Sequence, residues 1–415
     1  MNLDQDFFDF VVVGGGPAGF FSAISCLEKN QDLKVCIIEK GHQLLAKVLI
    51  SGGGRCNLTH ACFDPTLLVL NYPRGGKALR GPFTRFQPRD TMKWFEARGV
   101  PLKTENDGRV FPLSDSSQTI YTCLVQTAKD LGAHIFTRIG VESIRPRPDH
   151  SFTVLLSTGT ALQARKILLA TGGTPQSYPL AVTLGHTIQP PAPSLFTFTI
   201  DDPLLKGLAG LSIQDAELQL CGTKFKQRGP VLVTHWGISG PAVLKLSAWG
   251  ARVLYEHTYQ ATLLLNWLPV FNQDSLFQRF LSEKNLPNHH QIQTTDPAQI
   301  LPRRIWKRLV ETAGIAVDIT WHTASKSQLN TLAALITRTE LVIGGKGEFK
   351  EEFVTCGGIT LKEVDFKTMQ SKICPGLYFA GELLDIDGVT GGFNFQNAWT
   401  TGWIAGQAIA EALSS

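Results

Sequence analysis

Three glycines near the N-terminus have the spacing that binds phosphate groups. Gly14, Gly16 and Gly19 form a G-x-G-x-x-G pattern between a β-branched run (11–13) and an apolar helical pattern (20–27). One glycine allows a tight turn, one lets a pyrophosphate approach the bare backbone, and one lets helix and strand pack closely. The helix N-terminus then offers N–H groups and a favourable dipole to the phosphates. This turn therefore predicts a dinucleotide ligand.

An acidic residue follows at the position that recognises a ribose. A second strand pattern (34–38) ends at Glu39, 20 residues after the last of these glycines. A carboxylate there can accept the ribose hydroxyls. The order strand, glycines, helix, strand and acid indicates a dinucleotide-binding unit. We include Pro17, Ala18 and Lys40 among its contacts.

A second glycine-rich loop occupies residues 47–59. Three consecutive glycines followed by Arg-Cys-Asn exceed what a simple connection needs. Their backbone N–H groups, with two cations, would close over the diphosphate from the side opposite the first turn. The predicted contacts in this loop are Lys47, Ser51, Gly52, Gly53, Gly54, Arg55, Cys56 and Asn57.

Two later segments also end in small residues. The buried-type strand 166–170 runs into a glycine pair, where the chain can pass under a cofactor. The segment 375–394 delivers Gly-Glu at the end of a strand, then a glycine pair, then a helix over 396–412. A helix N-terminus beside a flavin's N1–C2=O edge would stabilise the anion formed on reduction. The predicted contacts, with Val141 from the strand pattern 135–144, are Thr171, Gly172, Gly173, Gly381, Glu382, Asp385, Gly391, Gly392, Phe393 and Asn394.

These segments from both ends of the chain converge on one ligand. That plan is typical of two-dinucleotide-binding flavoproteins, in which FAD lies extended across a Rossmann-like sheet. The fold class that we predict is α/β, with a Rossmann-like FAD domain at 1–190 and 355–415. Prolines at 190–193 mark a boundary, and short strand patterns predict an inserted β-barrel domain at 191–268 and 341–354. Residues 269–340 have helical patterns and form a helical insertion in that domain.

Among the strand patterns of the inserted domain are 195–200, 216–220, 223–226 and 231–234.

The composition limits the class of protein. With 415 residues, 43% hydrophobic and 18% charged, the chain is an ordinary globular protein. The first ten residues carry three aspartates, and no apolar run approaches ~20 residues, so we expect neither a signal peptide nor a membrane span. Eight cysteines without a C-x-x-C pair favour a reducing cytoplasm and predict no metal site.

A basic and aromatic stretch lies at 71–98. It has seven Lys or Arg residues against two acids, with five interleaved aromatic residues. This composition suits single-stranded nucleic acid, and the net charge of +4 permits such a partner. The alternative, which we favour, is a solvated helix face over 89–98 with the aromatic rings in the core.

Three further residues are candidate substrate contacts. Arg109 and Phe111 follow a turn and share one side of a short strand, so together they either hold a planar substrate or serve the structure. Trp236, beside His235, lies at a corner before a helix that begins near Pro241. This corner could face the cofactor, although a lone histidine is more often structural.

Taken together, these motifs resemble the HI0933-like (YhiN/BaiN-like) family of FAD-dependent flavoproteins, over essentially the whole chain. The resemblance implies the same FAD domain, β-barrel insertion and helical subdomain. One departure is His60, where the family loop usually has asparagine; a contact near the flavin loop is then absent or replaced. The matching segments are 13–19, 47 with 51–57, 108–112, 234–241, 354–359, 376–385 and 391–394.

The resemblance implies several reactions. The leading one is reduction of a conjugated C=C bond by an NAD(P)H-fed flavin, with uridine in large-subunit ribosomal RNA as substrate. The alternatives are an oxidase of a small amine such as aminoacetone, with oxygen as acceptor, and a redox-inactive FAD-dependent RNA-binding or assembly protein. For the proton donor we consider Cys356, His235 and Asp107, in that order. The oligomeric state is monomer or dimer.

Overall fold

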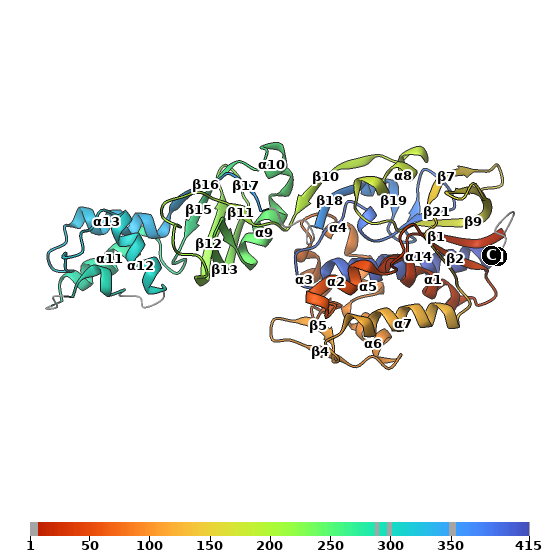
Figure 1. Ribbon diagram of the computed structural model, residues 1–415, viewed down its shortest axis with the longest axis horizontal. Helices are drawn as coiled ribbons and strands as arrows, with labels where there is room; N and C mark the ends of the chain where they lie inside the picture. The colour runs from red at the N-terminus through yellow and green to blue at the C-terminus, as the bar shows by residue number, and fades with distance from the viewer. Residues whose placement is uncertain (1–6, 287–289, 297–300, 348–353, 415) are drawn as a thin grey trace. The chain divides into compact units, whose positions relative to one another are not determined.

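The computed structural model describes residues 7–286, 290–296, 301–347 and 354–414. They form two compact units: the first combines 7–192 with 354–414, and the second comprises the described residues between 193 and 347 (Figure 1). Of the strand return expected over 341–354, residues 348–353 lie outside the described residues.

The first unit is built on a sheet of nine strands in the part of the chain that the structure describes. Its central strands pair in parallel, and the β-branched residues of β1 are buried because helices cover such sheets on both faces. In sheet order the parallel strands are β21 (Leu377–Phe379), β9 (Ala161–Leu169), β1 (Phe7–Val13), β2 (Val35–Glu39) and β6 (His134–Thr137). Antiparallel strands extend it: β19 (Val364–Asp365) and β20 (Gln370–Ser371) beside β21, and β7 (Val141–Pro146) and β8 (Phe152–Leu156) beside β9.

Two helices from opposite ends of the chain pack against each other. Helix α1 (Pro17–Lys29) starts with proline at its first position, and helix α14 (Phe393–Ser414) ends the described chain. A Cβ at Gly402 would lie 2.6 Å from Ala18 O, and one at Gly406 would lie 2.4 Å from Ser22 O. These glycines therefore allow the two helix backbones to approach closely, which fixes the start of α14 relative to the first turn.

Shorter elements surround this centre. The helices are α2 (Ala46–Gly54), α3 (Pro65–Leu68), η1 (Val69–Asn71), α4 (Gly76–Leu79), α5 (Pro82–Arg85), α6 (Pro88–Glu96), α7 (Ser117–Asp130), η2 (Pro175–Ser177), α8 (Pro179–Thr183), η4 (Leu361–Glu363) and η5 (Gly381–Leu383). The strands are β3 (Thr59–His60), β4 (Leu102–Thr104) and β5 (Arg109–Pro112) in one small sheet, and β10 (Ile188–Ser194) with β18 (Val354–Ile359) in another.

In the basic stretch at 71–98, a helix exposes its basic residues while most of the aromatic rings lie in the core, as we favoured from the sequence. Tyr72, Phe83, Phe86 and Phe95 are buried, so these rings belong to the core and are not available to stack on nucleobases. Helix α6 begins with a capping box and buries an apolar face, with its basic residues on the other side.

The second unit contains a curled antiparallel sheet. Its strand order is β16-β15-β12-β13-β14-β11-β17, and only Gly344 separates the two edge strands β16 and β17 in the chain. Because the edges are one residue apart, the sheet must curl back on itself. The strands are β11 (Phe198–Thr199), β12 (Ser212–Leu220), β13 (Lys226–Thr234), β14 (Gly237–Ser239), β15 (Ala261–Asn266), β16 (Thr339–Ile343) and β17 (Gly345–Lys346).

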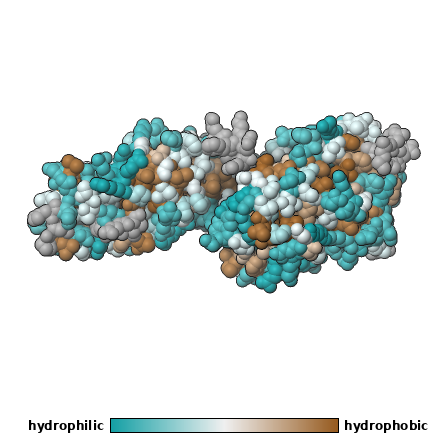
Figure 2. All heavy atoms as spheres, turned by 60° about the horizontal axis from the view of Figure 1, so that its bottom comes forward, coloured by the Kyte–Doolittle hydropathy of each residue, from teal (hydrophilic) through white to brown (hydrophobic). Residues whose placement is uncertain are grey.

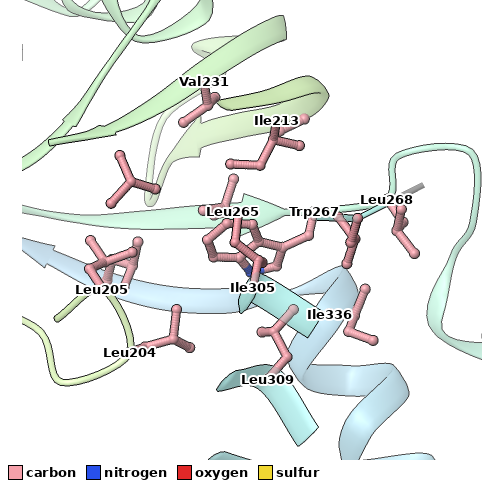
Figure 3. Packing of buried hydrophobic residues seen from close by; sticks show 14 of the residues in the cluster. Leu204, Leu205, Ile213, Val231, Leu265, Trp267, Leu268, Ile305, Leu309 and Ile336 are labelled. Atoms are coloured by element: carbon pink, nitrogen blue, oxygen red, sulfur yellow. The ribbon is translucent and has the colours of Figure 1, made fainter. Parts of the chain in front are cut away.

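The helices of the second unit share the core of this sheet. Trp267 and Leu265 from the sheet side pack with Ile305 and Leu309 of α12 and Ile336 of α13 (Figure 3). The Trp267 indole Nε1 donates to Thr339 Oγ1 at 2.7 Å, so its polar group is satisfied. The helices are α9 (Pro241–Trp249), α10 (Ala251–Glu256), α11 (Gln273–Lys284), η3 (Ile292–Thr294), α12 (Arg303–Thr312) and α13 (Lys326–Thr337).

Two strand predictions in this unit are wrong. The pattern at 223–226 forms a turn instead of a strand: Thr223 Oγ1 donates to Leu220 O and accepts from Phe225 N, and β13 begins only at Lys226. The strand expected over 195–200 is limited to Phe198–Thr199. In both places local side-chain hydrogen bonds or loop packing replace the ladder that the apolar pattern suggested.

The surface carries hydrophilic and hydrophobic residues intermixed on the face drawn in Figure 2. Among the described residues, no helix combines the length and the hydropathy needed to cross a bilayer. The same residues contain no group of three or more His, Cys, Asp or Glu side chains placed to hold a metal ion.

Candidate functional site

The first glycine turn is closed on the protein side and open on the other. Gly14 has φ +116°, and a Cβ there would lie 2.4 Å from Ala170 O; a Cβ at Gly19 would lie 2.1 Å from Gly14 O. At Gly16, by contrast, no atom lies within 4 Å of the Cβ position. The turn therefore packs tightly onto β9 and α1 and leaves bare backbone facing outward at Gly16, as a pyrophosphate would require.

Glu39 supports this turn directly. Its carboxylate accepts a hydrogen bond from Gly15 N (2.7 Å, Oε2) and from Gly41 N (2.6 Å, Oε1). An ionised carboxylate has about four acceptor sites, so both oxygens retain capacity for ribose hydroxyls. Lys40 is exposed next to Glu39, with its side chain near Gly140.

The second glycine loop is the irregular end of α2. Gly52, Gly53 and Gly54 have φ of +58°, +68° and +82°, a left-handed run that residues with a Cβ rarely adopt. Gly53 and Gly54 face open space, whereas Gly52 packs near the Phe111 ring. We predicted a loop from 47 onward, but a helical segment starts at Ala46 and the chain leaves helical geometry at Ser51. The open glycines again leave backbone accessible to a ligand.

The residues after these glycines join the loop to the segment 381–394 near the C-terminus, which we call the return. With its side-chain amide oriented to suit both neighbours, Asn57 donates to Thr59 O (3.1 Å) and accepts from Gly392 N (3.0 Å). A Cβ at Gly392 would lie 2.5 Å from Thr59 O, which explains the glycine there. Burial raises the pKa of the Cys56 thiol to about 12, so this group stays protonated and contributes packing.

The two cations of this loop are paired with carboxylates. Lys47 Nζ binds Glu382, the acid predicted at the end of β21. Arg55 Nη1 binds Glu105 at 2.7 Å, and its guanidinium lies 4.0 Å from the Phe111 ring centre. Lys47 and Glu382 therefore bring the loop and the return together across 335 residues of sequence.

The return segment is fixed by its own hydrogen bonds. Gly381 N donates to Thr401 Oγ1 of α14 at 2.9 Å. Asn394 accepts from Gly388 N (2.8 Å) and donates to Gly388 O (3.0 Å), so its side chain closes the glycine turn just before α14. Phe393 stacks on His60, at 4.7 Å between ring centres. The histidine that departs from the family loop thus packs against the return.

The segment after β9 lies against the same return. Gly172 has φ +81° and faces open space, while a Cβ at Gly173 would lie 2.9 Å from Glu382 O. Asp385 Oδ1 accepts from Gly357 N at 3.1 Å, which places Asp385 next to the buried Cys356 of β18. Thr171 O accepts from Ser177 Oγ at 2.8 Å. The structure therefore brings the predicted contacts Gly173, Glu382 and Asp385 together with Cys356, the first candidate for the proton donor.

Two buried polar side chains at this site lack partners. Asn397, in α14, is fully buried, and neither its Nδ2 nor its Oδ1 has a hydrogen-bond partner among the described residues. The hydroxyl of Tyr178, which follows η2, is also buried and unpartnered. Buried polar groups normally have partners, so both residues indicate a molecule that completes the site. The sequence offered no motif for either one. With the open glycine faces, the buried amide of Asn397 fits an extended dinucleotide such as FAD.

Other predicted site residues lie elsewhere in the first unit. The small sheet holds Asp107, Arg109 and Phe111. Phe111 is fully buried beneath Arg55, and Arg109 pairs with Asp107 (Nε–Oδ2 2.7 Å) and with Glu105 (3.0 Å). Substrate binding by Arg109 and Phe111 therefore stays a prediction. The Phe111 ring is buried and has no exposed face on which a planar substrate could stack. Val141 lies in β7 opposite Leu156, and its cofactor contact also stays a prediction.

Asp107 is poorly suited to donate a proton. Burial raises the pKa of its carboxyl, but hydrogen bonds from the Arg109 backbone and guanidinium outweigh that effect and lower it below the usual range. The group is then ionised at neutral pH. His235 and Trp236 follow β13 in the second unit and are exposed; their contact with the cofactor stays a prediction.

Comparison with known proteins identifies similar chains. The family model described as "HI0933-like protein Rossmann domain" matches residues 8–408. A ribosomal RNA dihydrouridine synthase of Escherichia coli (strain K12) is 29% identical over 419 residues, covering 98% of this chain and 99% of the relative. A 3-dehydro-bile acid delta(4,6)-reductase of Clostridium scindens is 28% identical over 410 residues, covering 96% and 98%.

A solved structure shares the fold. The 3-ketosteroid-Δ4-(5α)-dehydrogenase of Rhodococcus jostii RHA1 superimposes with a TM-score of 0.53 at 14% identity, covering 99% of this chain and 98% of that one. The fold is thus a mixed α/β, Rossmann-like fold of the FAD-binding type with additional antiparallel sheets.

Proposed function

Because the chain belongs to the HI0933-like family of flavoprotein oxidoreductases, we propose that it is an FAD-dependent reductase of a conjugated C=C bond, with NAD(P)H as donor. Uridine in large-subunit ribosomal RNA is the leading substrate, and the cytoplasm is the expected location. The observation that carries the proposal is the nearly full-length similarity to a dihydrouridine synthase and to a bile acid delta(4,6)-reductase. Both names describe the saturation of a C=C bond conjugated with a carbonyl group.

The site supports FAD as the resident cofactor. The adenine half would lie on the turn at 14–19 with its ribose near Glu39, because among the glycines of that turn only Gly16 faces open space. The flavin half would lie among the glycine loop 51–57 and the return 381–394, which contact each other through Asn57 and Gly392. When bound, FAD would supply a two-electron carrier between NAD(P)H and the substrate.

The finer architecture is part of the same proposal. We interpret the first unit as a two-dinucleotide-binding domain and the second unit as an inserted β-barrel domain, since only Gly344 separates the edge strands of its sheet. Helices α11 to α13 then form the helical subdomain. The sequence has one dinucleotide fingerprint, so NAD(P)H would dock transiently at the flavin.

The chain's own residues would position the flavin and orient its charge. The N-terminus of α14, a helix of 22 residues, directs its dipole toward the return segment. That dipole favours negative charge on a group bound there. Asn394 cannot compete for such a group, because its amide is engaged with Gly388.

The test is a comparison of electron acceptors. The purified protein should be yellow, and NAD(P)H should bleach its flavin absorbance without oxygen. Incubation with unmodified large-subunit ribosomal RNA should then lower the uridine absorbance and produce dihydrouridine, and a reaction without NAD(P)H is the control. Rapid hydrogen peroxide release with aminoacetone and no change in RNA would instead identify an amine oxidase. A flavin that no donor bleaches would favour a redox-inactive RNA-binding protein.

A further inference from the structure

Tyr178 has a buried hydroxyl group with no partner in the protein. The side chain is 5% exposed, and its oxygen has no hydrogen bond to any described residue. Phenylalanine would fill the same volume without leaving a polar group unsatisfied. Buried tyrosine hydroxyls normally find a partner. We therefore infer that the partner of this hydroxyl is a molecule that binds during the protein's function.

The backbone holds Tyr178 at the ligand-binding edge of the sheet. Tyr178 follows β9 after the glycine pair, and Ser177 Oγ donates to Thr171 O at 2.8 Å. Thr174 Oγ1 and Ser177 Oγ lie 2.9 Å apart, which closes this turn. Ala181 N donates to Tyr178 O at 2.9 Å and starts the next helix. In parallel sheets, ligands bind at this carboxyl edge of the strands.

The groups that act electrostatically on the hydroxyl belong to the proposed flavin site. Burial, followed by the charges of Asp385, Cys356 and Glu382, raises the pKa of Tyr178 to about 12. These groups belong to β18 and to the return after β21. Arg74, paired with Asp387, acts on the same Asp385 and Cys356. With these surroundings the phenol keeps its proton at neutral pH and can donate it.

Two other polar groups of the first unit are less suitable as proton donors. Asp107 is held ionised by Arg109. Asn397 also lacks partners, but a carboxamide does not give up a proton at neutral pH and is suited to hold a ligand. Tyr178 combines a labile proton, burial and the absence of a protein partner.

We propose that Tyr178 is the proton donor of the C=C reduction, an assignment that rests on the proposed function. Bound FAD would supply the hydride, taken originally from NAD(P)H, for the new C–H bond at the carbon β to the carbonyl group. The O–H bond of Tyr178 breaks, and its proton forms the second C–H bond at the α carbon. The tyrosinate then takes a proton from water. In total, NAD(P)H and one proton convert C=C into CH–CH and release NAD(P)⁺.

The experiment separates electron transfer from proton transfer in the holoenzyme. Tyr178→Phe should bind FAD with unchanged affinity, be bleached by NAD(P)H at the wild-type rate, and reduce ferricyanide normally, since this acceptor needs no proton. Its reduction of unmodified ribosomal RNA, or of a 4-ene-3-ketosteroid as a small-molecule probe, should fall by about 10²- to 10⁴-fold. The matched control is Tyr255→Phe, at an exposed tyrosine of the second unit, which should behave like wild type in every assay.

Each other outcome has a definite meaning. If Tyr178→Phe reduces the C=C substrate as fast as an active wild type, the tyrosine's role is overturned and the proposed function stands. If the variant loses FAD affinity by tenfold or more, the hydroxyl serves the cofactor, and the proton-donor assignment is overturned. A wild type that reduces ferricyanide but neither C=C substrate overturns the proposed function, and the tyrosine's role with it.

Discussion

The buried ion pair between Arg74 and Asp387 should be a major contribution to the stability of the first unit. The guanidinium Nε and Nη2 bind the two carboxylate oxygens, and the side chains are only 11% and 0% exposed. Asp387→Asn keeps the shape but removes the negative charge, which leaves the Arg74 charge buried without its main partner. Breaking such a pair from one side costs about 3–5 kcal/mol of unfolding free energy.

The assay is urea unfolding of the wild type and of matched variants. Asp107→Asn is the control, because the Asp107–Arg109 pair in the same unit has side chains that are 55% and 40% exposed and should contribute about 1 kcal/mol or less. The double variant Arg74→Met with Asp387→Leu removes both charges and should recover most of the loss. If Asp387→Asn is no more destabilising than Asp107→Asn, the argument from burial is refuted.

Three further predictions concern other contacts of the first unit. Gly14→Ala should lose FAD, measured by the flavin-to-protein absorbance ratio, because the new Cβ would lie 2.4 Å from Ala170 O; full FAD occupancy would contradict this. Gly406→Val should lower the unfolding free energy by about 1–3 kcal/mol, since its Cβ meets Ser22 O at 2.4 Å; an unchanged urea midpoint would refute close packing. Burial lowers the pKa of His186 below its usual 6.5, despite the opposing effect of its hydrogen-bonded partner, so the folded state resists protonation. Its contribution to the unfolding free energy is present above about pH 6.5 and is lost as the pH falls from there through the lowered pKa. His186→Gln should therefore flatten the dependence of the unfolding free energy on pH, measured by urea unfolding between pH 7 and 5.

The first turn could be predicted because its geometry is encoded locally. The contact of Gly19 with Gly14 O and the open space at Gly16 follow from a strand, a turn and a helix adjacent in sequence, whereas Gly14 meets the distant Ala170 O. The same holds for a helix with strong periodicity: the one expected over 396–412 is Phe393–Ser414. Short apolar patterns such as 223–226 were not reliable, because one threonine hydroxyl there stabilises a turn instead.

Pairings across the sequence could not be predicted. Arg74 belongs to a stretch that was considered as a surface for nucleic acid, yet it pairs with an aspartate 313 residues later. Lys47 and Glu382 were both predicted to contact the cofactor, and they bind each other. A charged residue has no partner written in its local sequence, so the partner emerges only when the fold brings distant segments together.

The proton donor illustrates a second kind of missing information. Cys356 was the first candidate because it stands beside glycines, a feature of its immediate sequence. Tyr178 stands out only through what its hydroxyl fails to contact, and that depends on every neighbour in the folded chain. Asn397 is distinguished in the same way, but the chemistry of the two groups differs. An amide can only orient a bound molecule, whereas a phenol can give it a proton, so the same hydrogen-bond accounting assigns binding to Asn397 and proton transfer to Tyr178.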